Sequence, residues 1–106
     1  NIKMYSVNFS NKAVEDLSNI WNYSAKRWSI KQANYYYNFI TLYCKSIGNN
    51  PVLLGTKYDE IAEGLLGCKV KEHIVFYQIK EDSVFIIRIL HKRMDIKKAI
   101  VSRNSQ

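Results

Sequence analysis

The sequence predicts an α+β fold, in which an N-terminal strand and a two-helix antiparallel hairpin precede a three-stranded antiparallel meander, with all strands in one sheet. Apolar residues recur at three- and four-residue spacing from position 13 to position 47, as in amphipathic helices. From position 65 to position 90 they run together or alternate with polar residues, as in strands. The 106 residues, 24% charged and 47% apolar, suit one globular domain over residues 1–106. Residues 1–3 precede Met4 and are interpreted as a remnant or an upstream start.

A strand is expected at residues 5–9, where apolar and polar residues alternate. Ser10 follows and offers an N-cap oxygen to a helix of about five turns. The apolar stripe of this helix consists of Ala13, Val14, Leu17, Ile20, Trp21, Ser24, Ala25 and Trp28.

A second helix is expected to begin after Ser29, which forms a capping box with Gln32. We expect Gly48 to end it in the left-handed conformation, and Pro51 prevents its continuation. Because almost no linker separates the two helices, they must be antiparallel. The stripe of the second helix consists of Ala33, Tyr36, Tyr37, Ile40, Tyr43, Cys44 and Ile47.

Residues 52–63 lack periodicity and are expected to form a connecting loop. The three strands of the meander are then expected at residues 65–70, 73–80 and 83–90. Glu81 and Asp82 form the tight turn between the last two strands, and a short helix is expected at residues 94–102.

The net charge of +7 and the pI near 9.5 attract anionic partners, although charge that serves only solubility remains an alternative. Cys44 and Cys68 lie 24 residues apart without metal-site spacing, and the only histidines are His73 and His91. We therefore expect free thiols, no metal and no cofactor. No apolar run approaches the length of a membrane span, so a cytoplasmic protein with no membrane partner is expected.

The end of the third meander strand carries the most informative feature of the chain. An apolar stretch opens abruptly into His91, Lys92 and Arg93, which places an imidazole and two cations where a buried strand emerges. A strand that only filled a core would not need this ending. The cluster could bind phosphate or an acidic protein.

Several motifs occur in order from residue 5 to about residue 100, and the two most specific are Leu54-Gly55-Thr56-Lys57-Tyr58-Asp59-Glu60-Ile61 with Gly64-Leu65, and Ile87-Arg88-Ile89-Leu90-His91-Lys92-Arg93-Met94-Asp95. Together these motifs resemble the ParE toxins of the RelE/ParE toxin–antitoxin superfamily. The resemblance implies a RelE/ParE-like fold. One position departs from the pattern, since ParE-like sequences usually carry arginine where this chain has Leu66; Lys69 or Lys71 is a candidate replacement.

The resemblance also implies a cytoplasmic inhibitor of bacterial growth, of the kind that stabilises plasmids, neutralised by a ParD-like antitoxin with an acidic, amphipathic segment. Characterised ParE toxins act on DNA gyrase, whereas the RelE branch cleaves mRNA in the ribosome. We expect a gyrase inhibitor that binds its target through His91, Lys92 and Arg93. The first alternative is a RelE-type endonuclease, and the second is a non-toxic nucleic-acid-binding module. Stable direct binding of nucleic acid is not expected, because neither helix is basic along one face.

If the protein is a nuclease, His91 would act as acid or base and Arg93, Lys69 and Lys71 would stabilise phosphorane charge. Alternation places Arg88 on the opposite strand face from His91, and Phe85, Ile87 and Ile89 on the face of His91, unless a bulge intervenes.

Arg88 lies inside an apolar strand, so we expect it to be a structural cation paired with Glu60 or Asp59. Trp28 and Tyr35 are expected to anchor the antitoxin on the outer side of the helical hairpin.

Overall fold

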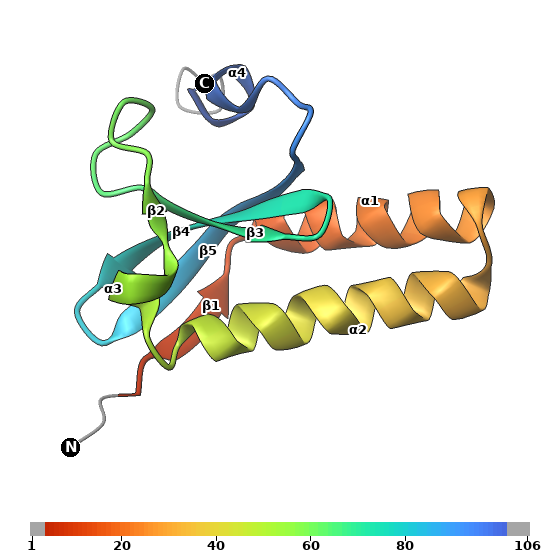
Figure 1. Ribbon diagram of the computed structural model, residues 1–106, viewed down its shortest axis with the longest axis horizontal. Coiled ribbons are helices and arrows are strands. Elements are labelled where there is room, and N and C mark those ends of the chain that lie inside the picture. The colour runs from red at the N-terminus through yellow and green to blue at the C-terminus, as the bar shows by residue number, and fades with distance from the viewer. Residues whose placement is uncertain (1–3, 102–106) are drawn as a thin grey trace.

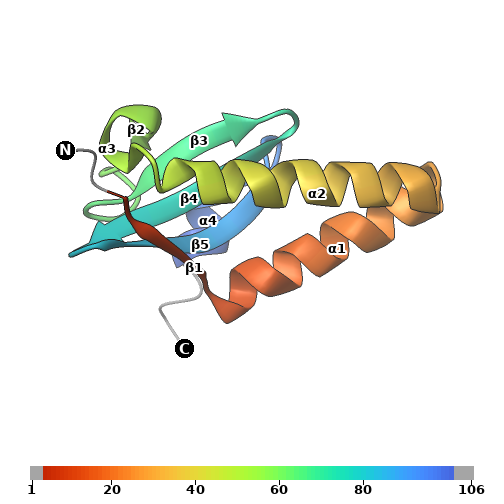
Figure 2. The ribbon, with the colours of Figure 1, turned by 90° about the horizontal axis from the view of Figure 1, so that it is seen from below.

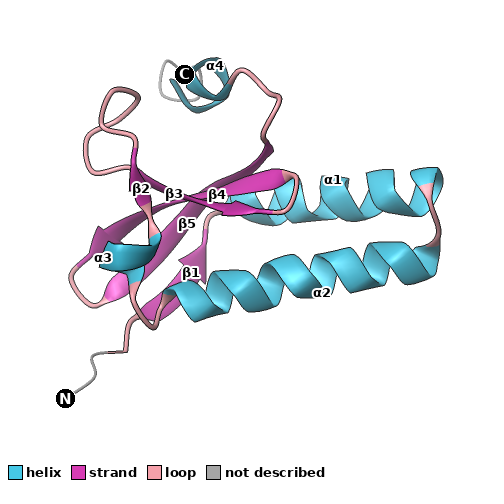
Figure 3. Cartoon of the chain, in the orientation of Figure 1, coloured by secondary structure: helices cyan, strands magenta, loops and turns pink. Residues whose placement is uncertain are grey.

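The computed structural model describes residues 4–101, so residues 1–3 and the last expected helical residue, Ser102, lie outside the described residues. The elements follow in the order β1 (Ser6–Phe9), α1 (Asn11–Arg27), α2 (Ile30–Ile47), α3 (Pro51–Leu54), β2 (Thr56–Lys57), β3 (Leu66–Val70), β4 (His73–Lys80), β5 (Ser83–His91) and α4 (Ile96–Val101). The expected strand, helical hairpin and meander are all present, and the α+β class is confirmed (Figure 3).

The five strands form one sheet in the order β1-β5-β4-β3-β2. β3, β4 and β5 are the expected antiparallel meander, whereas β1 pairs with β5 in parallel, with Ser6 opposite Ser83. The two-residue strand β2 was not expected and pairs with β3. The hairpin of α1 and α2 lies along one face of the sheet and extends beyond it, and α4 lies on the other side (Figures 1 and 2).

Serine side chains begin both long helices, as the sequence predicts. Ser10 Oγ accepts a hydrogen bond from the Ala13 amide (3.0 Å) and donates one to the Ile87 carbonyl on β5 (2.7 Å). Ser29 Oγ accepts from the Gln32 amide (3.0 Å). The first cap thus also fixes the start of α1 against the sheet.

The prediction of a left-handed Gly48 was wrong, because this residue has right-handed backbone angles, φ −59° and ψ −18°. Glycine is needed here for close approach instead: a Cβ atom would lie 2.6 Å from the Tyr5 carbonyl oxygen. The Gly48 carbonyl accepts a hydrogen bond from the Tyr5 amide (3.0 Å). Pro51 then begins the short helix α3 rather than a loop, at the position where proline is best tolerated.

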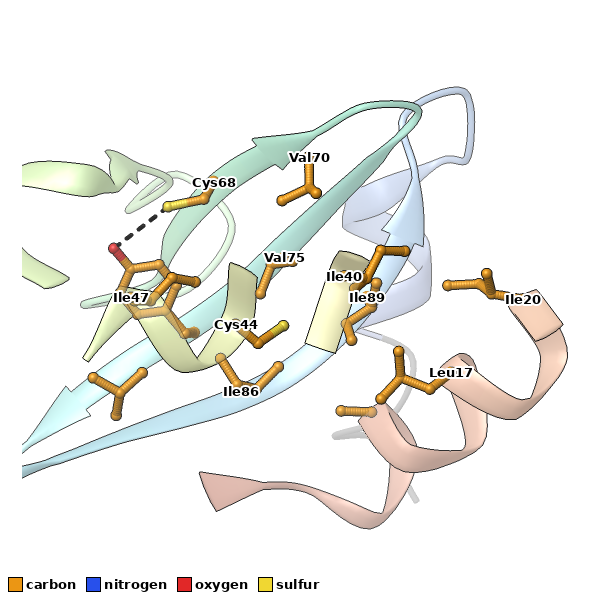
Figure 4. Close-up of a cluster of buried hydrophobic side chains, with 13 residues drawn as sticks. Leu17, Ile20, Ile40, Cys44, Ile47, Cys68, Val70, Val75, Ile86 and Ile89 are labelled. Carbon is orange, nitrogen blue, oxygen red and sulfur yellow. Dashed lines mark hydrogen bonds between the residues drawn. The ribbon is translucent and has the colours of Figure 1, made fainter. Parts of the chain in front are cut away.

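The larger core fills the space between the hairpin and the sheet (Figure 4). Its buried members are Ala13, Leu17, Ile20, Ile40, Cys44, Ile47, Cys68, Val70, Val75, Tyr77, Val84, Ile86 and Ile89. Both cysteines are free, as expected. Of the predicted first stripe, only Ala13, Leu17 and Ile20 are members of this core. Val14 is 51% exposed, and Trp28, just past the end of α1, is 66% exposed.

A smaller core lies on the opposite face of the sheet, under α4. Its buried members are Leu65, Ile74, Phe76, Leu90 and Ile100. Within residues 4–101, no helix is both long enough and apolar enough to cross a bilayer.

A β-bulge interrupts β5 and changes which side chains face the hairpin. Phe76 pairs with Arg88 and Tyr77 with Ile86, so Ile87 has no partner on β4. Before the bulge, Ile86 faces the hairpin; after it, Ile89 does, while Ile87 packs in the smaller core. Phe85 and Ile87 therefore lie on the opposite face from His91, and the prediction that they share its face was wrong because it assumed unbroken alternation.

Candidate functional site

A groove of about 630 Å³ lies between the helical hairpin and the end of β5. Its walls are largely apolar and aromatic, and its polar side chains come from both helices and from the neighbouring ends of β4 and β5. The residues that line it are Asp16, Asn19, Ile20, Tyr23, Ser24, Trp28, Gln32, Tyr36, Glu72, His73, Arg88, Ile89, Leu90, His91 and Met94. The groove is therefore a composite of the two halves of the chain.

Two histidines face each other across β4 and β5 in this groove. His73 pairs with His91 in the sheet register, and their ring centroids lie 5.2 Å apart in an edge-to-face arrangement. His73 Nδ1 lies 2.7 Å from the Tyr36 hydroxyl of α2. Because the Glu72 amide donates to that hydroxyl (3.4 Å), the tyrosine hydrogen is free to bond to His73 Nδ1. The contact fastens α2 to the start of β4.

The electrostatic environment of His73 differs from that of an exposed imidazole. Burial, and then the proximity of His91, lower the pKa of His73 to about 4, so His73 is neutral at pH 7. Burial likewise raises the pKa of Tyr36. Both members of the Tyr36–His73 bond are therefore uncharged under ordinary conditions, which suits a structural contact within an apolar groove.

The residues after His91 form a tight, ordered exit from the sheet. His91 Nδ1 accepts a hydrogen bond from the Arg93 amide (3.1 Å). Lys92 Nζ lies 3.2 Å from the Glu72 carboxylate, and this hydrogen bond is the main reason that the pKa of Glu72 is lowered. The side chains of Lys92 and Arg93 are exposed, whereas His91 is half-buried at the edge of the groove. We call His91, Lys92 and Arg93 the β5-end cluster.

Arg88 pairs with Asp16 of α1, so the prediction of Glu60 or Asp59 as its partner was wrong. Arg88 Nε donates to Asp16 Oδ2 (2.9 Å) and Nη2 donates to Oδ1 (3.0 Å), a bidentate arrangement that raises the pKa of Arg88. Arg88 Nη1 also donates to the Ala99 carbonyl of α4 (3.3 Å). The side chains of Arg88 and Asp16 are only 12% and 9% exposed.

Asp16 also binds the backbone at the edge of the sheet. β1 pairs only with residues 83–86 of β5, so the remainder of that edge has no strand partner. Asp16 Oδ2 accepts a hydrogen bond from the otherwise unpaired Ile89 amide (2.9 Å). Sequence reasoning missed Asp16, although an acidic residue inside an apolar helical stripe was the available signal, since buried carboxylates need partners.

Of the residues of the nuclease alternative, His91 and Arg93 lie together at the end of β5, whereas Lys69 and Lys71 lie elsewhere. Cys68 and Val70 face the hairpin, so Lys69 between them lies on the opposite face of β3 from the groove. Lys71, in the turn after β3 with a φ of 55°, places Nζ 4.5 Å from the centroid of the Phe39 ring.

Leu66, where ParE-like sequences usually have arginine, packs against the larger core. Lys69 lies on the other face of the strand from Leu66, and Lys71 lies beyond the far end of that strand, roughly 15 Å away along the chain. Neither lysine therefore occupies the place of the missing arginine side chain.

A family model described as the ParE toxin of the type II toxin–antitoxin system parDE matches residues 7–96. The chain belongs to this family. It is 33% identical over 88 residues to Toxin ParE1 of Caulobacter vibrioides, covering 83% of this chain and 90% of that one. It is 31% identical over 81 residues to Toxin ParE1 of Mycobacterium tuberculosis, covering 76% and 82% of the two chains. As a ParE toxin, the protein is the toxin component of a type II toxin–antitoxin system.

Solved structures confirm the RelE/ParE fold. The ParE toxin resembles a chain of the chromosomal ParDE toxin–antitoxin system of P. aeruginosa with a TM-score of 0.74, at 18% identity over 84% of this chain and 97% of that one. It resembles a chain of the RelBE2 toxin–antitoxin complex of Mycobacterium tuberculosis with a TM-score of 0.65, at 17% identity over 84% and 99% of the two chains.

Proposed function

We propose that this ParE toxin inhibits bacterial growth by acting on DNA gyrase in the cytoplasm, and that the β5-end cluster contacts the target. The observation that carries the proposal is the difference in burial among the cations of β5 and the residues that follow it. Arg88 is committed to a largely buried ion pair, whereas Lys92 and Arg93 are exposed and contribute nothing to either core. Exposed cations at the end of a rigid strand are well placed to bind a partner, since the scaffold fixes their position.

Family membership supports gyrase over ribosome-bound mRNA. A RelE-type cleavage site needs cations and an acid or base around one phosphate. Lys69 faces away from the groove and Lys71 lies against Phe39, so His91 and Arg93 would lack both of these candidate lysines. We propose a non-nucleolytic inhibitor.

We further propose a ParD-like antitoxin that binds through an acidic, amphipathic segment. Residues 17–58 contain no aspartate or glutamate but five lysines and arginines, so the hairpin and the segment after it attract an acidic partner. Trp28 and Tyr35, which are 66% and 55% exposed, are the proposed anchors. Alanine at either position should weaken the complex by about 1–2 kcal/mol, measured by calorimetry, if the residue is a hot spot.

Supercoiling by purified gyrase tests the proposed target. The wild-type toxin should reduce supercoiling, and a Lys92→Ala, Arg93→Ala double variant should require several-fold more protein for the same effect. Lys80→Ala, an exposed lysine at the opposite end of the sheet, is the matched control and should behave as wild type. Unchanged supercoiling at a large molar excess of wild-type toxin would sink the proposal, and cleavage of mRNA at ribosomal positions would establish the nuclease alternative.

A further inference from the structure

We propose that the cations at the end of β5 and on α4 bind the phosphate backbone of the DNA that gyrase holds, so that the toxin recognises the gyrase–DNA complex rather than gyrase alone. The inference rests on the proposed function, because it takes gyrase as the target. It deepens that function by assigning duplex DNA, a polyanion, as the partner of one part of the toxin surface.

Four exposed cations follow one another where the chain leaves β5 and turns into α4 (Figure 1). They are Lys92, Arg93, Lys97 and Lys98, and we call them the C-terminal basic surface. The one acidic residue between positions 83 and 101 is Asp95. Its Oδ1 atom accepts a hydrogen bond from the Lys98 amide (3.1 Å), so this carboxylate is engaged at the start of α4. Residues 92–98 thus carry four positive charges and one negative charge.

The packing of α4 directs its lysines away from the protein. Ile96, Ala99 and Ile100 pack in the smaller core under this helix. Because an α-helix has 3.6 residues per turn, Lys97 and Lys98 lie on the opposite side of α4 and are exposed. A hydrogen bond from the guanidinium of β5 to the Ala99 carbonyl (3.3 Å) fastens α4 to the strand. The lysines are therefore held on an ordered support and free to contact a partner.

The C-terminal basic surface lacks the apolar anchors from which protein–protein interfaces draw most of their affinity. The exposed large apolar side chains of residues 92–101 are Met94, which lines the groove, and Val101 at the end of α4. By contrast, the helical hairpin exposes Tyr23, Trp28 and Tyr35 by more than half. Phosphate binding needs no apolar anchor, because charge-assisted hydrogen bonds and the release of counterions drive it. The hairpin therefore suits a protein, and the C-terminal basic surface suits a polyanion.

The spacing of the cations fits the backbone of a duplex. Six residue steps separate Lys92 from Lys98, so their Cα atoms lie at most about 20 Å apart. Over that length each strand of B-DNA carries about six phosphates, which is enough to engage all four cations. α4 has 6 residues, too few to place side chains along several base edges in a groove. Contact with the backbone, independent of sequence, is therefore expected.

Four phosphate contacts are too few to hold free DNA tightly. Non-specific binding of this kind has a Kd of about 10⁻⁴–10⁻⁶ M at physiological salt, which agrees with the expectation that the toxin alone does not bind nucleic acid stably. On gyrase the situation differs, because contacts with the enzyme hold the toxin beside the bound duplex. The effective concentration of phosphate near the C-terminal basic surface then rises, and the weak contact adds to the affinity for the complex.

A binding experiment separates contact with DNA from contact with gyrase. Fluorescently labelled toxin is titrated with gyrase, with gyrase loaded with a linear duplex, and with the duplex alone, at several salt concentrations. At low salt the wild type should bind loaded gyrase about tenfold or more tighter than free gyrase. The slope of log affinity against log salt should be steeper by about 3–4 for loaded gyrase, since each phosphate contact contributes about 0.9.

Paired substitutions assign this effect to α4. Lys97→Ala with Lys98→Ala should reduce the difference in slope by about 2 and leave the affinity for free gyrase within about twofold of the wild type. Lys97→Arg with Lys98→Arg keeps both charges and should keep the slope. Lys45→Ala with Lys80→Ala removes the same charge from exposed positions in the last turn of α2 and at the end of β4, and should behave as the wild type.

The outcomes distinguish the inference from the proposed function. Equal affinities and equal salt slopes for free and loaded gyrase would overturn the inference while the proposed function stands. Equal affinities for the duplex alone and for loaded gyrase would also overturn it, because the toxin would then bind DNA without the enzyme. Failure of the toxin to bind gyrase in either state would instead refute the proposed target.

Cross-linking then locates the contact. Both native cysteines are buried, so a photoreactive group attached to the thiol of Lys98→Cys marks one position on the surface. In the complex with loaded gyrase this group should cross-link to DNA, whereas the same group on Lys45→Cys should not. Cross-links from position 98 to gyrase protein alone would overturn the inference, because an acidic surface of the enzyme would then occupy the place assigned to DNA.

Discussion

Replacing Arg88 by alanine should strongly destabilise the ParE toxin, because three structural elements depend on its guanidinium. The substitution removes two charge-assisted hydrogen bonds to Asp16 on α1 and one bond to the Ala99 carbonyl of α4. It also leaves a carboxylate whose side chain is only 9% exposed without its cation. Breaking a buried ion pair in this way costs about 3–5 kcal/mol.

The expected cost lies at the lower end of that range, about 3 kcal/mol, since Asp16 keeps its hydrogen bond from the Ile89 amide and the pair is not fully sealed from water. For a domain of this size, each kcal/mol shifts the melting temperature by about 4–8 °C, so Arg88→Ala should lower it by about 12–24 °C. Circular dichroism melts at neutral pH measure the shift.

A double-mutant cycle separates this pair from other losses. Asp16→Ala should also destabilise the protein, and the double variant should be about 1–3 kcal/mol more stable than the sum of the two single effects predicts. If the effects of the two substitutions on the free energy of unfolding simply add, the interaction between Arg88 and Asp16 does not contribute to stability. If Arg88→Ala melts like the wild type yet is non-toxic, Arg88 belongs to the functional surface and the structural assignment fails.

Three further predictions concern the β5-end cluster, the histidine pair and Gly48. Arg93→Ala removes an exposed cation, so it should reduce growth inhibition in cells while melting within about 2 °C of the wild type; a large loss of stability would show that the cluster is structural. His73 has a folded pKa of about 4 against about 6.5 unfolded, so the unfolded chain binds a proton that the folded chain does not, and stability falls as pH drops from 6.5 toward 4. Between pH 7 and pH 5 the free energy of unfolding should fall by about 1 kcal/mol from this cause, after allowance for solvent screening. Urea titrations at the two pH values should show a correspondingly smaller fall for His73→Gln than for the wild type. An identical fall in both proteins would show that His73 is not the cause. Gly48→Ala should cost about 1–3 kcal/mol, because the new Cβ would lie 2.6 Å from the Tyr5 carbonyl oxygen and 2.9 Å from Val7 Cγ2 and would push β1 away from α2; wild-type stability in the same titration would show that β1 can move freely.

The sequence predicts most of the fold because local chemistry decides most of its boundaries. Ser10 and Ser29 begin helices by capping, and the strand at residues 73–80 follows from its apolar run and flanking turns. Strand β2 was not predicted, because two residues carry no periodicity and because its position depends on the backbone of Leu66, with which it pairs. Gly48 was misassigned because its constraint comes from Tyr5, more than forty positions away, and not from its own helix end.

The site was harder to predict than the fold for the same reason. The β5-end cluster is visible in the sequence as an abrupt change from apolar to cationic residues. The partner of Arg88 is not visible in the sequence. β1 pairs with only the first part of β5, and the bulge at Ile87 shifts the residues that follow, so Asp16 of α1 reaches the edge of β5 that β1 leaves free. The groove itself combines α1 and α2 with β4 and β5, and no local pattern indicates which residues of two distant segments share a cavity.

The parallel pairing of β1 with β5 has a consequence for the co-translational folding of the toxin. Ser6 and its neighbour Ser83 are 77 positions apart, and β5 lies between β1 and β4 in the sheet. At roughly 5–20 residues per second, synthesis of the intervening chain takes about 4–15 s. During that interval β1 has no strand to pair with, Asp16 lacks its partner Arg88, and the side of the groove that His91 lines has not been synthesised. The nascent toxin therefore gains its complete surface only after β5 has been synthesised, which gives an antitoxin already present in the cell time to meet the chain as it folds.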